Sequence, residues 1–308
     1  MGRRRVLLIT VAAVALLAFS AALFYTLREE GVVLLRVATT TSLYDTGLLD
    51  KLAAVFEQEH PNVRIQFVAV GTGQALRLAA DRSVCMVLVH APNLEKLYIE
   101  RGVLRDHVIF AYNFFVIVGP RSDPANVSRA SSPVDAFRRI YEAGVEGRAV
   151  FVSRGDCSGT YVRERVIWME AGLDPRPGRD PWYISAGAGM AATLRVADEK
   201  RGYTLSDIGT FAALYSRGAL HNLVLLYPRG GGKPLLLMNV YSAYIVAGCS
   251  GEALKAAKAF LEFLETKGQD VIASYRVGGF QLFYPARGLN LTSYWEALAS
   301  LPTPAECR

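Results

Sequence analysis

Residues 151–160 read Phe-Val-Ser-Arg-Gly-Asp-Cys-Ser-Gly-Thr. The apolar start predicts a short buried strand, and the polar, glycine-containing centre predicts a loop that leads into a helix over residues 160–171. The first N–H groups of a helix have no partner inside the helix and lie at the positive end of its dipole. This unit of strand, loop and helix therefore predicts an α/β fold and a place where an anion binds.

Three further loops share this composition, at residues 39–42, 71–74 and 185–189, and each directly precedes a predicted helix. Glycine lets the backbone approach a ligand closely, and hydroxyl groups donate hydrogen bonds. Ser and Thr are ordinary helix caps, but four such loops at the carboxyl ends of strands, where α/β proteins bind ligands, indicate more than capping. Arg154 is the only basic residue in them, so we expect a small dianion held by neutral donors and one fixed charge.

The composition is that of a globular protein, with 308 residues of which 52% are hydrophobic and 20% charged. At ~150 residues per domain, this length predicts two domains. The net charge is +6, but no basic cluster follows Arg3–Arg5, so no nucleic-acid partner is expected. From Leu34 onward strands and helices alternate, which predicts mostly parallel sheets. Within this alternation we expect a strand over 114–118 and a helix over 205–217.

The N-terminal segment, residues 1–30, carries the signal for location. Arg3–Arg5 precede an uncharged run over residues 6–27, which is long enough to span a bilayer. The positive charges stay on the cytoplasmic side, so the rest of the chain is expected outside. The run is longer than the ~7–15 apolar residues of a typical signal peptide, which favours a membrane anchor over a cleaved signal peptide.

The sequence offers little for catalysis. None of the four histidines has a partner at a spacing that suits acid–base or metal chemistry, and we expect a structural role even for His90, the best placed of them. There is no Gly-x-Ser-x-Gly elbow and no phosphate-binding P-loop. We therefore expect no catalytic residue, no metal site and no cofactor, and hence no enzyme.

The four cysteines are widely spaced and resemble neither a zinc site nor a redox pair. Outside the cytoplasm disulfides are permitted. We expect buried thiols, or at most one bridge that ties the C-terminal tail through Cys307. Cys157, inside the loop quoted first, is expected to be a thiol at the edge of the site.

Several motifs together resemble the extracytoplasmic tungstate-binding proteins of ABC importers, and they do so in their order and spacing from about Leu35 to Tyr284. One departure is Cys157, where that family often has a second Asp. A second is the stretch 81–86, where the family usually has acidic residues. The motifs are Ala-Thr-Thr-Thr-Ser at 38–42, Asp-x-Gly-Leu-Leu-Asp at 45–50, Val-Gly-Thr-Gly-Gln-Ala-Leu at 70–76, Leu-Val-His-Ala-Pro at 88–92, Phe-Val-Ile-Val-Gly-Pro at 115–120, the loop at 151–160, and Gly-x-Gly-Met-x-x-Thr-Leu at 187–194.

The resemblance implies a periplasmic-binding-protein fold, in which two α/β lobes close on the oxyanion. Lobe I would comprise residues 31–112 and 243–308, and lobe II residues 113–242, with crossing strands near 112–118 and 238–246. The implied partners are tungstate or molybdate, which the sequence does not separate, and an ABC permease. The residues expected to bind the oxyanion are Thr40, Thr41, Ser42, Thr72, Arg154, Ser158, Gly159 and Thr160.

Two alternatives remain open. The run from Arg154 to Thr160 also resembles phosphate-binding proteins of the same fold. Phosphate carries a proton near neutral pH and so benefits from an acceptor, whereas tungstate carries none. Asp156 aimed at the ligand would therefore favour phosphate, and Asp156 turned onto Arg154 or a helix N-terminus would favour tungstate. From another class, the body could be a membrane-anchored sensory or catalytic module, although the missing acid–base cluster disfavours catalysis.

Overall fold

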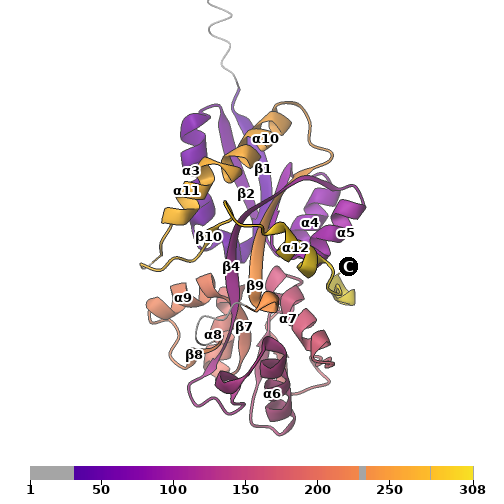
Figure 1. Ribbon diagram of the computed structural model, residues 1–308, viewed down its shortest axis with the longest axis vertical. Coiled ribbons are helices and arrows are strands. Elements are labelled where there is room, and N and C mark those ends of the chain that lie inside the picture. Colours follow the sequence, from indigo (N-terminus) through magenta and orange to yellow (C-terminus); the bar gives the residue numbers. More distant parts are fainter. Residues whose placement is uncertain (1–30, 229–233, 278, 308) are drawn as a thin grey trace, which may run out of the picture.

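The computed structural model describes residues 31–228, 234–277 and 279–307, and its elements form two groups. Two long strands run between the groups: β4 (Leu104–Pro120) and β9 (Met238–Val246). They pair with each other in antiparallel fashion from Leu104↔Val246 to Phe114↔Met238. Figure 1 shows them as the vertical connection between an upper and a lower body.

The upper group is built on the parallel strands β1 (Val33–Thr40), β2 (Val63–Val70) and β3 (Met86–Val89), in the order β9-β3-β1-β2. Successive side chains of a strand face opposite sides of the sheet. Val37 accordingly packs in the core with Phe56 and Phe260, and Ala38 packs in a second core with Leu76. The remaining elements of this group are α2 (Thr41–Tyr44), α3 (Leu48–Glu59), α4 (Thr72–Ala80), α5 (Pro92–Glu100), α10 (Gly251–Glu265), α11 (Lys267–Ser274), β10 (Tyr284–Pro285) and α12 (Thr292–Ala299).

The lower group surrounds the second half of β4, which pairs with β7 (Thr204–Asp207) and β8 (Leu223–Tyr227). A separate two-stranded parallel sheet contains β5 (Phe151–Ser153) and β6 (Tyr183–Ser185). Its core is aromatic, with the rings of Phe137 and Trp168 4.4 Å apart. The helices are α6 (Pro133–Val145), α7 (Gly159–Glu170), α8 (Met190–Lys200) and α9 (Ile208–Ser216), and the short 3-10 turns of the whole structure are η1 (Val127–Arg129), η2 (Leu235–Leu237) and η3 (Ala305–Cys307).

The α/β class is confirmed, but the expectation of mostly parallel sheets is wrong. Within the described residues three strand pairs are parallel and five are antiparallel. The reason is that β4 takes part in four of the antiparallel pairs, as it crosses from one group to the other. Alternation of strands and helices along the chain does not reveal such a crossing strand.

Two local expectations also differ from the structure. The strand expected over 114–118 is the middle of the 17-residue β4. The helix expected over 205–217 begins only at Ile208, because residues 204–207 pair with Phe115–Val118. Asp207 then caps α9, since its Oδ1 accepts a hydrogen bond of 2.8 Å from the Thr210 N–H.

The expectation for the cysteines is right for the bridge that ties the C-terminal tail through Cys307, but wrong for buried free thiols and for a limit of one bridge. All four are paired, as Cys85–Cys249 and Cys157–Cys307. The partners are 164 and 150 residues apart in the sequence, so only the folded topology brings them together. Cys157 is therefore not a thiol at the edge of the site.

The expected anchor or signal segment, residues 6–27 within 1–30, lies outside the described residues. Among the residues that the structure does describe, no helix has both the length and the apolar character needed to cross a membrane.

Candidate functional site

The candidate site lies where the upper sheet faces the lower group. The parallel strands β1, β2 and β3 end at Thr40, Val70 and Val89. Carboxyl ends of parallel strands meet at one edge of a sheet, so the residues that follow them lie side by side there. This edge presents the start of α2, the start of α4 and the side chain of His90.

The lower group contributes two loops to the same place, and glycines bring the backbones close. The Gly73 N–H donates a hydrogen bond of 3.2 Å to the Cys157 carbonyl oxygen. A Cβ atom on Gly71 would lie 3.3 Å from the Asp156 carbonyl oxygen, and one on Gly189 would lie 3.8 Å from Thr41 Oγ1. The four loops singled out in the sequence therefore meet, two from each group.

Unpaired polar atoms gather in these loops. The hydroxyl oxygens of Thr41, Thr72 and Thr160 and the Nε of Arg154 are buried and have no hydrogen-bond partner within the described part of the chain. Leaving a buried donor unsatisfied costs about 1–3 kcal/mol, so such groups normally have a protein, water or ligand partner. They come from α2, α4, α7 and the loop before α7, and each can donate a hydrogen bond. Their chemistry suits a ligand that presents several oxygen atoms.

Arg154 is the fixed charge of this arrangement. Only 2% of its side chain is exposed, and its Nη2 lies 2.6 Å from Asp156 Oδ2. The other oxygen of Asp156 accepts a hydrogen bond of 3.2 Å from the Ser158 N–H, at the N-terminus of α7. The Asp156 carboxylate is thus turned onto Arg154 and the helix start.

The other expected residues lie in the same loops. Thr40 and Ser42 are buried, with their hydroxyl oxygens 3.5 Å apart. Ser158 caps α7, because its Oγ accepts a hydrogen bond of 3.2 Å from the Tyr161 N–H, which leaves the hydroxyl hydrogen available. Gly159 faces the His90 ring so closely that a Cβ atom there would lie 2.5 Å from His90 Cε1.

Sequence reasoning missed a polar network behind the loops. His90 Nδ1 lies 2.8 Å from Asn239 Oδ1, and the amide of Asn239 donates to Asn113 Oδ1 and Tyr241 Oη, each at 2.8 Å. Since Asn239 Oδ1 accepts, His90 carries its hydrogen on Nδ1, and Nε2 faces Ser42 Oγ at 3.5 Å. A lone Asn inside each of two apolar strands was the available signal.

His90 gives the first testable prediction. Burial lowers its pKa to about 3, opposed by the Asn239 hydrogen bond, while the charges of Arg154 and Arg163 lower the pKa further. Between about pH 6.5 and 3 the unfolded chain therefore binds a proton that the folded chain does not. The contribution of His90 to the free energy of unfolding must fall as the pH falls through this range. Denaturant unfolding at several pH values measures this effect. As the pH falls, the free energy of unfolding should decrease more steeply in the wild type than in His90→Gln.

The comparison between variants is needed because another buried group acts in the opposite direction. Burial raises the pKa of Glu164 to about 7, so the folded chain holds a proton there between about pH 4.5 and 7 that the unfolded chain releases. Glu164 is unchanged in His90→Gln, and its effect cancels in the difference. Equal pH slopes in the two proteins would show that His90 is not held neutral by the fold.

Comparisons with known proteins agree with the fold and the loops. Residues 29–266 match the family model of the PBP superfamily domain. The chain is 42% identical over 256 residues to a putative ABC transporter anion-binding protein of Haloferax volcanii, covering 82% of this chain and 71% of the relative. It is 35% identical over 244 residues to the tungstate-binding protein TupA of Peptoclostridium acidaminophilum, and this match covers 78% of this chain and 80% of the relative.

A solved structure agrees as well. The tungstate-binding protein TupA of Desulfovibrio alaskensis matches with a TM-score of 0.67 and 36% identity, covering 82% of this chain and 98% of that one. The chain therefore belongs to the periplasmic-binding-protein superfamily, in the family of the tungstate-binding proteins of ABC transporters.

Proposed function

We propose that this protein is the extracytoplasmic solute-binding component of an ABC importer, that it captures tungstate or molybdate, and that it delivers the anion to a permease. The observation that carries the proposal is the set of buried, unpaired donors on Thr41, Thr72, Thr160 and Arg154. The chain is a binding protein and not an enzyme, as its membership of this family implies.

The donors match the chemistry of a dianion without protons. Such an anion only accepts hydrogen bonds, and each of the four groups only needs to donate. A hydrogen bond to a charged partner contributes about 1.5–3 kcal/mol, more than one between neutral groups. Arg154 supplies one charge and the helix starts of α4 and α7 supply partial positive charge.

The direction of Asp156 supports tungstate over phosphate. Phosphate that carries a proton needs an acceptor in the site. Both oxygens of Asp156 are engaged, with Arg154 and the Ser158 N–H, and those of the buried Asp207 are engaged with Thr210. No second function is favoured by a comparable observation.

Closure and location follow as further parts of this proposal. The lobes would be residues 31–112 with 243–308, and residues 113–242, and an anion held by Thr41, Thr72 and Arg154 together would stabilise their closed arrangement. The apolar run 6–27 would hold the protein at the outer face of the membrane, beside the permease.

Calorimetric titration tests the ligand. Tungstate or molybdate should bind at least 100-fold more tightly than phosphate at pH 7, because a proton-bearing ligand would leave a buried donor facing a donor, at a cost of about 2.7 kcal/mol or more. Sulfate, a dianion without protons but of smaller size, is the matched control for size. Phosphate binding as tight as tungstate binding would reject the proposed ligand and support the phosphate-binding alternative.

A further inference from the structure

The C-terminal segment is anchored first on the upper group. In α12, Trp295 Nε1 donates a hydrogen bond of 2.9 Å to Glu95 Oε2 on α5. The Asn93 side chain donates to the Pro302 carbonyl oxygen at 3.0 Å, and Thr303 Oγ1 donates to the Asn93 carbonyl oxygen at 3.1 Å. Up to Thr303, the segment is therefore attached to α5.

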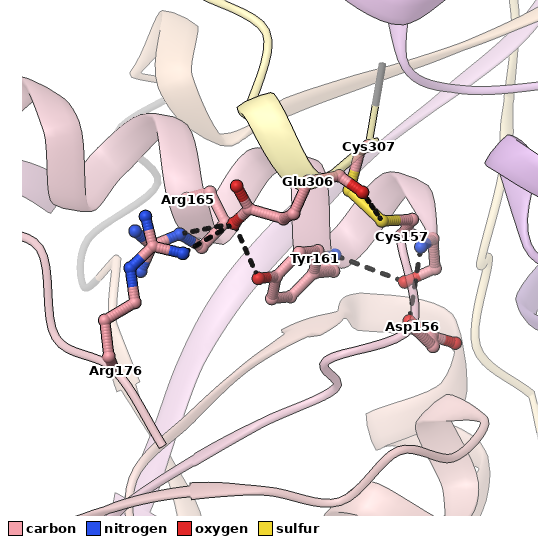
Figure 2. Close-up of a disulfide and its surroundings, with 8 residues drawn as sticks. Asp156, Cys157, Tyr161, Arg165, Arg176, Glu306 and Cys307 are labelled. Atoms are coloured by element: carbon pink, nitrogen blue, oxygen red, sulfur yellow. Dashed lines mark hydrogen bonds and ion pairs between the residues drawn. A yellow bond between two sulfur atoms is a disulfide. The ribbon is translucent and has the colours of Figure 1, made fainter. Parts of the chain in front are cut away.

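Its end is attached to the other group, as Figure 2 shows. Cys307 forms a disulfide with Cys157, which lies in the loop between β5 and α7. The neighbouring Glu306 carboxylate accepts a hydrogen bond of 2.8 Å from the Tyr161 hydroxyl, and its Oε1 lies 3.3 Å from both Arg165 Nε and Arg176 Nη1. Arg165 is 2% exposed beneath this contact.

The connection between the two attachments is short. Only residues 304–306 separate Thr303, the last contact with α5, from Cys307. Four Cα-to-Cα steps span at most ~14 Å when fully extended, and here part of them is coiled in η3. The upper group cannot move far from the Cys157 loop at this edge unless the contacts with Asn93 break.

Cys157 also lies in the middle of the loop between β5 and α7, which carries Arg154. It follows Asp156 and precedes Ser158, and its carbonyl oxygen accepts the hydrogen bond from Gly73 of the opposite group. Its φ of +50° is a left-handed conformation that residues with side chains seldom adopt, so surrounding contacts must hold it. The disulfide is one such contact.

We propose that residues 303–307, the C-terminal strap, are a third connection between the lobes, beside β4 and β9, and that its disulfide positions the Arg154 loop opposite Thr41 and Thr72. This inference rests on the proposed function. A protein that binds only when closed has an apparent affinity reduced by its closed fraction. By limiting opening, the strap raises that fraction in the ligand-free protein and so tightens anion binding.

The second disulfide provides a matched control. Cys85–Cys249 closes a chain segment of similar length, 164 against 150 residues, but joins the residues before β3 and after β9, both in the upper group. Removing either disulfide should therefore release a similar chain entropy and lower the Tm similarly. We would compare Cys307→Ser with Cys249→Ser, as isolated monomers without reductant, by tungstate titration and by small-angle scattering.

Cys307→Ser should weaken tungstate binding by about 10-fold, because the closed fraction of the ligand-free protein falls, and should enlarge the ligand-free radius of gyration. Cys249→Ser should change neither. Equal Tm losses with unchanged affinity and size in both variants would show that the strap only stabilises the fold, and the inference would be wrong.

A second variant keeps the disulfide and tests the reach of the strap directly. Inserting Gly-Ser-Gly-Ser between Thr303 and Pro304 should reproduce the weaker binding and larger ligand-free size of Cys307→Ser, whereas wild-type behaviour would overturn the proposed limit on opening. If wild-type protein bound none of the oxyanions, the proposed function would fail, but the scattering comparison would still decide whether the strap limits opening.

Discussion

Replacing Arg154 by alanine is expected to weaken tungstate binding by about 2–5 kcal/mol, which is roughly 30- to 4,000-fold. Only 2% of the Arg154 side chain is exposed, and its Nε has no partner among the described residues. Its removal takes away the one fixed positive charge in the loops and leaves Asp156 without its ion pair. A carboxylate in that position repels a dianion, which adds to the loss. Calorimetric titration measures the effect directly.

Two further variants separate a ligand role for Arg154 from a bracing role. Arg154→Lys should recover only part of the affinity, because an ammonium is a point charge and does not reproduce the planar fork of donors. Asp156→Asn keeps Arg154 and removes the competing carboxylate, so tungstate affinity should be retained or increased. If Arg154→Ala lowered the Tm but left the affinity within a few-fold of wild type, Arg154 would only brace the loop.

The sequence predicted the features that are local. A loop rich in Gly, Ser and Thr between a strand and a helix is visible within about ten residues, and the loops around Thr41, Thr72 and Thr160 lie where this composition placed them. The meeting of the loops at Thr41 and Thr72 was predictable too, because the carboxyl ends of parallel strands share an edge, whereas the loop at Thr160 follows a strand of a separate sheet. The order of these motifs along the chain also identified the family.

Features that depend on distant parts of the chain were not predictable in this way. The pairing of Cys157 with Cys307 depends on where the tail returns, and no local pattern encodes that return. The segment Thr204–Asp207 directly precedes a helix, and it becomes a strand because β4 offers it a partner. His90 lacks a partner nearby in sequence, and Asn239, 149 residues away, supplies one.

Gly159→Ala is expected to weaken tungstate binding by about 1–3 kcal/mol, roughly 5- to 150-fold, while leaving the Tm of the ligand-free protein nearly unchanged. The added Cβ would lie 2.5–2.8 Å from three atoms of the His90 ring. That ring is held by Asn239 and lies against Tyr241, with centroids 5.0 Å apart, so it cannot easily yield. Gly159 belongs to the lower group and His90 to the upper, so the ligand-free protein relieves the clash by a small opening, within the range that the strap allows.

This combination of results distinguishes a block on closure from damage to the fold. Alanine favours the helical conformation at the start of α7, so local stability should not suffer. Adding His90→Ala removes the ring that the new methyl group meets, and the double variant should bind more tightly than the additive sum of the two single effects predicts. Strictly additive losses would mean that Gly159 and His90 do not meet in the bound form, and that the anion is held in a different arrangement of the two groups.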